Sequence, residues 1–318
     1  MNSTLFVGVD VSQRTLETAI EDQAHGSVIA NRSADIRAWL AQLPQRCCIG
    51  VESTGHYHQL LARHAHQAGH RVYVLNARDL SHYAQSLGRR AKTDRLDAQL
   101  IARYLAREHQ DLHPYQCPTP RQGQIDELIS RRHTAVVMQS ALRQSFSAMK
   151  RKPRALARAQ RSLQAVIEEL DERLKQLIHQ DPQLAVACQH LRGVVGFGAL
   201  LSGTLAHALT RHRFDNADAF IAYIGYDPRV RDSGQHRGRR FLSKRGPAEL
   251  RRLLYVAAMA ACKSKLWHPF YQRYRARGLS STAALVILAR KLARIAFSIV
   301  KYGTEFRPEL VRSACAQP

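Results

Sequence analysis

The order of short apolar runs and helical repeats in the first 110 residues constrains the fold more than any other feature of this sequence. The apolar runs have the length of β-strands, and between them lie stretches whose apolar residues recur every three to four positions. The predicted strands are residues 5–11, 15–20, 27–31, 47–51 and 71–75, and the predicted helices are residues 34–43 and 58–68. Strands that alternate with helices in this way predict a parallel sheet with helices packed on it.

Three strands followed by helix, strand, helix and strand is the element order of the RNase H-like fold, and acidic residues stand at its strand ends. Asp10 ends the first predicted strand and Glu52 follows the fourth, so both are expected at the edge where open α/β sheets place their sites. Asp94 and Asp97 are three residues apart, which puts them on one face of a helix. Four carboxylates at one edge are suited to a pair of Mg²⁺ ions acting on a phosphodiester.

Each of these carboxylates also has a purely structural interpretation. An aspartate at a strand end is often a turn former, and Thr93 could cap a helix whose first turn carries Asp94 and Asp97. Glu52 could simply precede the next helix. The residues alone leave both interpretations open.

The remainder of the chain is predicted to be mostly helical. Residues 121–185 indicate two long helices joined near Pro153, as an antiparallel hairpin or an oligomerising coiled coil. Residues 191–200 resemble a helix-hairpin-helix signature, whose glycines let main-chain N–H groups approach a DNA phosphate, although a plain glycine-capped turn is the alternative. We expect an α/β domain at 1–116, a helical segment at 117–185 and a mostly helical domain at 186–318.

The charge of the chain indicates a polyanionic partner. With 48 Lys and Arg against 25 Asp and Glu, the net charge is +23, and nucleic acid is the commonest partner of so basic a protein, ahead of a ribosome-like role or a membrane surface. Residues 229–252 hold nine basic and two acidic residues, and Ser233 and Ser243 lie among them as equal candidates for a nucleophile or a phosphate contact. Phosphate contacts are expected at Lys92, Arg95, Arg231, Arg237, Arg239, Arg240, Lys244 and Arg245.

Several other features have ordinary explanations. The start of the chain has no recognisable signal peptide, and no apolar run is long enough to span a bilayer, so no membrane partner is expected. The six cysteines lack metal or disulfide spacing, which is typical of a reducing cytoplasm. Arg131, Arg132 and His133 are predicted on an exposed helix face, whereas Trp267, Phe270, Tyr271 and Tyr274 are predicted to pack in a core.

Six segments together resemble the DEDD-type transposases of insertion sequences, a group that includes Piv-like DNA invertases and bridge-RNA-guided recombinases. The segments are residues 8–12 (GVDVS), 51–57 (VESTGHY), 88–98 (GRRAKTDRLDA), 193–198 (GVVGFG), 231–238 (RDSGQHRG) and 243–246 (SKRG). The resemblance covers nearly the whole chain. Gln13 and Ala77 depart from the family pattern, where Lys and Pro are usual.

This resemblance implies a specific mechanism. Asp10, Glu52, Asp94 and Asp97 would be the acidic tetrad of a RuvC-like domain, holding two Mg²⁺ ions, or Mn²⁺ in their place. Ser233 of the C-terminal transposase domain would attack DNA and form a covalent phosphoserine link.

The resemblance also implies partners and a location. Donor and target would be double-stranded DNA, selected by a structured bridge RNA. The site would combine domains of different protomers, with dimers meeting as a tetramer, in the bacterial cytoplasm at the nucleoid.

Two alternatives stay open at this point. One is a RuvC-like Mg²⁺-dependent endonuclease or junction resolvase that hydrolyses DNA with water, for which Ser233 is unnecessary. The other is a non-enzymatic nucleic-acid scaffold whose carboxylates merely cap helices.

Overall fold

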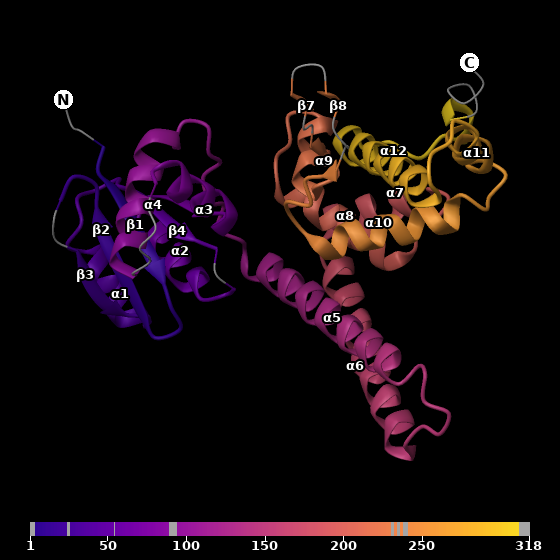
Figure 1. Cartoon of the computed structure of the whole chain (residues 1–318), viewed down its shortest axis with the longest axis horizontal. Coiled ribbons are helices and arrows are strands. Elements are labelled where there is room, and N and C mark those ends of the chain that lie inside the picture. Colours follow the sequence, from indigo (N-terminus) through magenta and orange to yellow (C-terminus); the bar gives the residue numbers. More distant parts are fainter. Residues whose placement is uncertain are drawn as a thin grey trace. The chain divides into compact units, whose positions relative to one another are not determined.

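The computed structural model of the chain forms two compact units, Met1–Cys117 and Pro118–Pro318 (Figure 1). The described residues are 4–23, 26–53, 55–88, 94–229, 232–233, 236–237 and 241–311. At residues 94, 95, 232, 233, 236 and 237 the description covers the backbone alone. The division of the chain into three domains stays a prediction.

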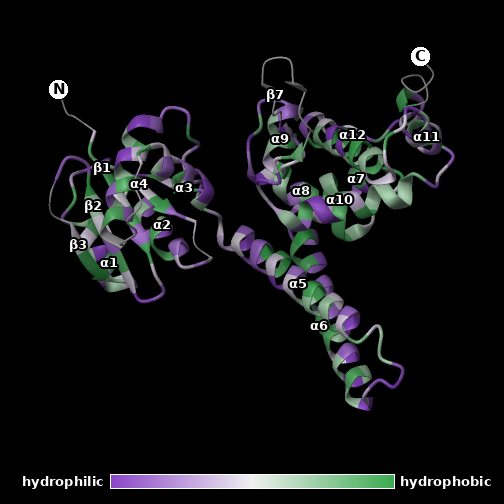
Figure 2. Cartoon of the chain, in the orientation of Figure 1, coloured by the Kyte–Doolittle hydropathy of each residue, from purple (hydrophilic) through white to green (hydrophobic). Residues whose placement is uncertain are grey.

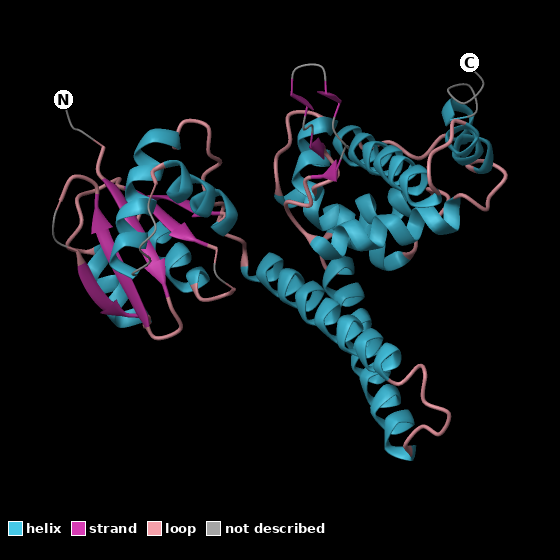
Figure 3. Cartoon of the chain, in the orientation of Figure 1, coloured by secondary structure: helices cyan, strands magenta, loops and turns pink. Residues whose placement is uncertain are grey.

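The first unit contains a five-stranded mixed sheet, in the predicted element order. Its strands are β1 (Phe6–Val11), β2 (Thr15–Ile20), β3 (Ser27–Ala30), β4 (Cys48–Glu52) and β5 (Arg71–Leu75). The spatial order is β3-β2-β1-β4-β5, with β2 antiparallel to its neighbours β1 and β3, and with β1, β4 and β5 parallel (Figure 3). A mixed α/β unit is therefore confirmed, and its topology fits the RNase H-like fold.

Helices cover both faces of this sheet because the strands alternate apolar residues between the two sides. On one face, Val7 and Val9 pack with Ile36 of α1 (Ser33–Leu40) and Leu61 of α2 (His58–Gln67). The opposite face packs against α3 (Ala77–Ser86) and α4 (Asp94–Glu108) through a core made of Cys48, Tyr73, Leu75, Leu80, Ile101 and Leu105.

Helix α4 lies directly on β1, and Gly8 makes this close approach possible. A Cβ atom at Gly8 would lie 2.1 Å from the Ala98 carbonyl oxygen and 2.3 Å from the Ala102 nitrogen. At the start of β1, the Phe6 ring lies 4.8 Å from the ring of His109, just beyond the end of α4. The helix therefore runs antiparallel to β1, with its first turn over the carboxyl end of the strand.

The Gly8→Ala substitution is expected to destabilise the first unit by about 3 kcal/mol, the upper part of the range for overpacked cores, because both clashing atoms belong to the α4 backbone. Chemical denaturation followed by circular dichroism measures the loss. Gly123→Ala is the matched control, since no atom lies within 4 Å of a Cβ there and the change favours its helix. An unchanged unfolding midpoint for Gly8→Ala would contradict the close contact.

The second unit begins with two long antiparallel helices, α5 (Pro120–Ser145) and α6 (Arg154–His179), which we call the helical hairpin (Figure 1). Thr119 caps α5 through a reciprocal capping box with Gln122, and Pro153 stands at the start of α6. The two predicted long helices are thus present. Their role as an oligomerising coiled coil stays a prediction.

The rest of the second unit is a helical bundle centred on α12. The helices are α7 (Pro182–Arg192), α8 (Ala199–Arg211), α9 (Ala217–Ile224), α10 (Ala248–Ala261), α11 (His268–Ala276) and α12 (Ser281–Tyr302). The buried residues of α12 contribute to a single apolar core with the other five. Apart from α11, these helices are more hydrophobic than the helical hairpin (Figure 2). Within the described residues, no helix is long and apolar enough to cross a membrane.

Four short strands join α9 to α10. They are β6 (Pro228–Arg229), β7 (Asp232–Ser233), β8 (His236–Arg237) and β9 (Phe241–Leu242). The outer pair, β6 and β9, and the inner pair, β7 and β8, are each antiparallel (Figure 3). We call the described residues of 228–242 the β-arm.

Candidate active site

Asp10 and Glu52 stand next to each other at the carboxyl ends of two parallel strands. The last register pair of β1 and β4 joins Val9 to Val51, and each acidic residue is the next one along its strand. Strand alternation places both on the face that α4 covers, and both residues are half-buried. The Val11 N–H donates to Asp10 Oδ1 at 3.0 Å, which fixes that carboxylate at the strand end.

The first turn of α4 carries the other two predicted metal ligands. Because α4 runs antiparallel to β1, this turn lies above the sheet edge that holds Asp10 and Glu52. Asp97 is half-buried there, whereas the side chain of Asp94 lies outside the described part of the chain. Oxygen donors on neighbouring strands and on the helix above them fit a hard divalent cation. Among the described side chains, no group of three or more His, Cys, Asp and Glu is arranged to hold a metal.

Two residues near this edge escaped the sequence analysis. Glu17 of β2 lies directly opposite Asp10 in the antiparallel pair, on the same face of the sheet. Asn31 donates from Nδ2 to the carbonyl oxygens of Ser12, at 3.0 Å, and Tyr57, at 3.3 Å, and so ties together the turns that follow β1 and β4. Hairpin register could have indicated Glu17, but the contacts of Asn31 depend on tertiary structure.

Ser233 lies in the β-arm, where its backbone pairs with His236 at the end of the inner strand pair. Its side chain lies outside the described residues, as does that of Arg237, which pairs with Asp232 through the backbone. Arg95 is described by its backbone only, and Lys92, Arg231, Arg239 and Arg240 are outside the described residues. Lys244 and Arg245 follow the arm and are exposed to solvent.

Ser243, the other candidate serine, is a structural residue at the base of the β-arm. It is 4% exposed, its backbone N–H donates to the Asp227 carbonyl at 2.9 Å, and its hydroxyl donates to the Asp227 carboxylate. Buried at the base, it lacks the access that a nucleophile needs. Burial thus argues against Ser243 as the nucleophile, which composition alone could not do.

Arg251 of α10 fastens the same base. Its Nη1 donates to the carbonyl oxygens of Ile224, at 2.8 Å, and Gly246, at 2.9 Å, on the two sides of the arm. The buried Tyr226 hydroxyl donates to the Arg251 carbonyl at 2.7 Å, and burial raises the pKa of this phenol well above its usual range. Arg251 therefore positions the arm instead of offering its charge to a phosphate.

The glycine-rich turn between α7 and α8 is built into the bundle. Gly196 has a φ of 101°, and a Cβ there would lie 2.8 Å from both the Ala257 oxygen and the Ala261 Cβ of α10. Gly198, at the start of α8, is exposed. Two helices joined by such a turn are compatible with a helix-hairpin-helix, and the predicted phosphate contact stays a prediction.

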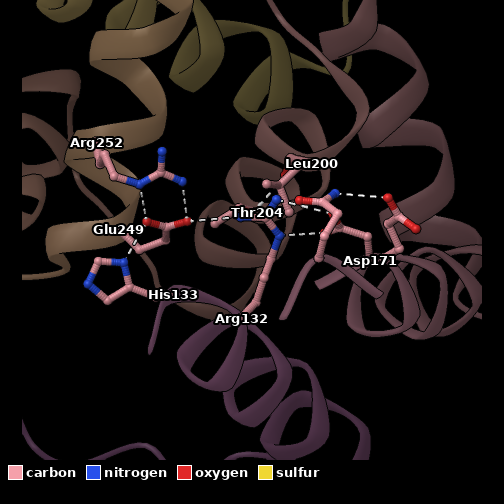
Figure 4. Close-up of polar contacts among 9 residues, drawn as sticks. Arg132, His133, Asp171, Leu200, Thr204, Glu249 and Arg252 are labelled. Atoms are coloured by element: carbon pink, nitrogen blue, oxygen red, sulfur yellow. Dashed lines mark hydrogen bonds and ion pairs between the residues drawn. The ribbon is translucent and has the colours of Figure 1, made fainter. Parts of the chain in front are cut away.

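A buried charge network joins the helical hairpin to α10 (Figure 4). Glu249 is 6% exposed and accepts from Arg252 Nε at 2.6 Å, His133 Nδ1 at 2.7 Å and Arg132 Nη1 at 3.4 Å. Arg132 also pairs with Asp171 of α6, Nη2 to Oδ2 at 3.1 Å. Burial raises the pKa of Glu249, but the hydrogen bonds and charges of Arg252 and His133 outweigh it and leave this pKa below its usual value.

This network corrects one expectation. Arg132 and His133 do not lie on a fully exposed helix face: the Arg132 side chain is only 12% exposed and the His133 side chain 31%. Arg131, which pairs with Glu127 at 3.6 Å and is 68% exposed, does lie on the surface. The prediction failed for Arg132 because its partner Glu249 is 117 residues away along the chain. Helical periodicity gives no information about a contact so distant in sequence.

The predicted packing of four aromatic residues near α11 in a core is confirmed. Trp267 is fully buried and Phe270 is 7% exposed, and Tyr271 and Tyr274 are half-buried against the same core. Their rings therefore stabilise the bundle.

Comparison with known protein families gives two matches. Residues 7–151 match a family model described as transposase of the DEDD type, DEDD_Tnp_IS110. Residues 188–274 match a model described as transposase of the IS116/IS110/IS902 family. The first match includes the strand-end carboxylates and the second includes the β-arm.

Curated relatives cover most of the chain. A pilin gene-inverting protein of Moraxella lacunata is 28% identical, over 80% of each chain. A probable family 20 transposase of Pseudomonas aeruginosa is 25% identical, over 95% of this chain and 98% of its own. The transposase of insertion sequence element IS1328 from Yersinia enterocolitica is 24% identical, over 96% of this chain and 99% of its own.

Proposed function

The chain belongs to the IS116/IS110/IS902 family of DEDD transposases and is thus a DNA-recombining enzyme, and from this premise we propose that it exchanges DNA strands through a covalent phosphoserine at Ser233. The non-enzymatic scaffold considered above is set aside by this membership. The water-using nuclease differs from the proposal in not needing Ser233, and it is the alternative that an experiment must test.

The observation that carries the proposal is the parallel pairing of β1 with β4. This pairing gives Asp10 and Glu52 adjacent positions on one face of the sheet, below the turn of α4 that contains Asp94 and Asp97. A divalent cation, Mg²⁺ or Mn²⁺, held by these four residues would offset negative charge at the scissile phosphate. The protein's own contribution is to keep the carboxylates close together, through the Gly8 contact and the hydrogen bond to Asp10.

In the proposed step, Ser233 Oγ forms a bond to the phosphorus while the bond from phosphorus to a deoxyribose oxygen breaks. The hydroxyl proton passes to solvent, and the leaving oxygen takes up a proton and becomes a free hydroxyl. Attack of a different deoxyribose hydroxyl on the phosphoserine then reseals the strand and restores Ser233. No external energy source is required because a phosphodiester is exchanged for another phosphoester.

Exposed basic residues would hold the DNA. Lys244 and Arg245 follow the β-arm, and we assign the phosphate contacts of the arm to them together with Arg231, Arg237, Arg239 and Arg240. Lys92 precedes the acidic turn of α4 in the sequence, Arg95 lies between Asp94 and Asp97, and both would bind the strand near the carboxylates.

The proposal includes an oligomer and a guide RNA. Val137 and Met138 of α5 and Val166 of α6 are 49%, 57% and 47% exposed, which supports pairing of helical hairpins between protomers. A net charge of +23 is compatible with binding a structured RNA as well as DNA. Sequencing of RNA that copurifies with the full chain tests this part, and recovery of no discrete RNA would argue against it.

The phosphoserine is tested with end-labelled DNA from the flanks of the gene. Wild-type protein and Ser298→Ala are expected to give a labelled protein–DNA adduct that survives denaturation, and Ser233→Ala is expected to give none. Ser298→Ala serves as the control because it removes an exposed hydroxyl from α12 of the same unit. Cleavage by Ser233→Ala at the wild-type rate, without an adduct, would establish the water-using nuclease instead.

A further inference from the structure

We propose that the exposed side of α11 and the turn before it bind a nucleic-acid backbone, separately from the β-arm. The surface consists of Lys263, Lys265, His268, Gln272, Arg275 and Arg277, and we call it the α11 face. The inference rests on the proposed function only in taking nucleic acid as the partner, and it adds a binding surface that the acidic site and Ser233 do not explain.

The first observation is the absence of acidic residues from this part of the sequence. Residues 250–304 contain no Asp and no Glu but eleven Lys and Arg, although the chain average would put about four acidic residues there. A solvated helix face usually mixes charges of both signs. Two of the eleven, Arg252 and Arg294, pair with carboxylates outside this segment. The positive charge that remains indicates a surface that is neutralised by a partner.

The second observation is how α11 divides its residues between core and solvent. Trp267 and Phe270 face the core, whereas His268, Gln272 and Arg275 recur at steps of four and three and are exposed on one side of the helix. Gln272 Nε2 lies 3.4 Å from His268 Nε2, so the exposed side chains form one continuous polar row. Lys263 and Lys265 extend this row into the preceding turn.

The third observation is that the cations of the α11 face lack acidic partners within the described residues. Lys265, Arg275 and Arg277 form no ion pair there, in contrast to Arg294 of α12, which pairs with Asp218. Arg275 instead donates to the Leu279 carbonyl oxygen, which orients its guanidinium without neutralising it.

Aromatic rings hold the guanidinium groups of Arg277 and of the neighbouring Arg273 in place. The Arg277 guanidinium lies 5.8 Å from the centroid of the Tyr274 ring, and that of Arg273 lies 5.5 Å from both Tyr274 and Phe270. A cation over a ring face keeps its full charge while losing little freedom on binding. Such preordered cations suit a rigid, regularly charged partner, as the phosphates of a nucleic-acid helix are.

Binding is tested on the full chain with the triple variant Lys265→Gln, Arg275→Gln and Arg277→Gln. The matched control, Arg37→Gln, Arg63→Gln and Arg71→Gln, removes the same charge from exposed positions in the first unit. Fluorescence anisotropy with a DNA duplex and, separately, a structured RNA measures affinity from about 50 to 200 mM salt.

The α11 variant is expected to bind at least one probe at least about tenfold more weakly and to lower the slope of log affinity against log salt by about two to three for duplex DNA, since each phosphate contact contributes about 0.9. Weakened binding to the duplex alone identifies DNA as the partner, and weakened binding to RNA alone identifies RNA. Equal behaviour of the α11 and control variants on both probes overturns the proposal.

Two further measurements distinguish a loss of binding from a folding defect and from a failure of the proposed function. A second triple variant keeps the charges, with Lys265→Arg, Arg275→Lys and Arg277→Lys. Its slope of log affinity against log salt is expected to equal that of the wild type, which would exclude a folding defect as the cause of the loss. Adduct formation by Ser233 is measured in parallel on the same proteins. Absence of an adduct from the wild type overturns the proposed function but leaves the binding result intact, so the two failures are distinguishable.

Discussion

Asp10→Asn is expected to lower the rate of DNA strand cleavage by about a thousandfold while the first unit stays folded. Asn has the shape of Asp and can still accept the hydrogen bond from the Val11 N–H, so the strand end is preserved. The lost charge weakens cation binding beside Glu52. Metal assistance at a phosphodiester is worth several kcal/mol, and about 4 kcal/mol corresponds to a factor of about a thousand.

The measurement is cleavage of labelled DNA under single-turnover conditions, with Mg²⁺ and with Mn²⁺. Glu52→Gln is expected to show a similar loss because it occupies the adjacent register position. Asp35→Asn is the control, as this exposed carboxylate lies in the first turn of α1, on the opposite face of the sheet. Cleavage by Asp10→Asn at the wild-type rate would show that this carboxylate takes no part in the mechanism and has only a structural role at the strand end.

The strand-end carboxylates could be predicted because local pattern and topology agree in this part of the chain. Short apolar runs that end in Asp10 and Glu52 identify both strands. Two antiparallel turns give β3 the direction of β1, and the helix between β3 and β4 then makes β4 parallel to both. The sequence could not indicate that α4 lies on β1 closely enough to require Gly8, because that contact joins elements about 90 residues apart.

The residues that sequence reasoning could not place are those whose partners are distant in the chain. Ser233 and Ser243 stand in the same basic stretch, and only the pairing of Ser243 with Asp227 gives it a structural role. Arg132 has the spacing of a surface residue on α5, yet it is buried by Glu249 and Asp171 from two other helices. Periodicity reports which side of a helix is apolar, and it does not report a buried ion pair.

Glu249→Gln is expected to destabilise the second unit by about 3 to 5 kcal/mol, the usual cost of removing one member of a buried ion pair. Arg132 and Arg252 would keep their charges in a poorly solvated site, where the Glu249 side chain is only 7% exposed. Urea denaturation followed by the fluorescence of the buried Trp267 measures the loss. Glu169→Gln is the matched control, because its pair with Arg173 at 2.9 Å is about two-thirds exposed and is worth at most about 1 kcal/mol.

The pH dependence of stability identifies the same group. The folded protein holds the pKa of Glu249 below its unfolded value, so the carboxylate stabilises the fold fully above the unfolded value of about 4.3 and loses this contribution as the pH falls through the folded pKa. Wild-type stability should therefore fall more steeply below about pH 4 than that of Glu249→Gln. Parallel curves for the two proteins would show that Glu249 does not titrate with folding.

The effect of Glu249→Gln should also reach the β-arm. Glu249 lies in the first turn of α10, two residues before Arg251, which fastens the base of the arm through the carbonyls of Ile224 and Gly246. At a temperature where the variant is still folded, it is expected to form the Ser233 adduct more slowly than the wild type, with unchanged affinity for DNA. Glu249→Asp, which keeps the charge on a shorter side chain, should recover part of this rate. A normal adduct rate in Glu249→Gln would limit the network to stabilising the bundle, because positioning of the arm would then not depend on it.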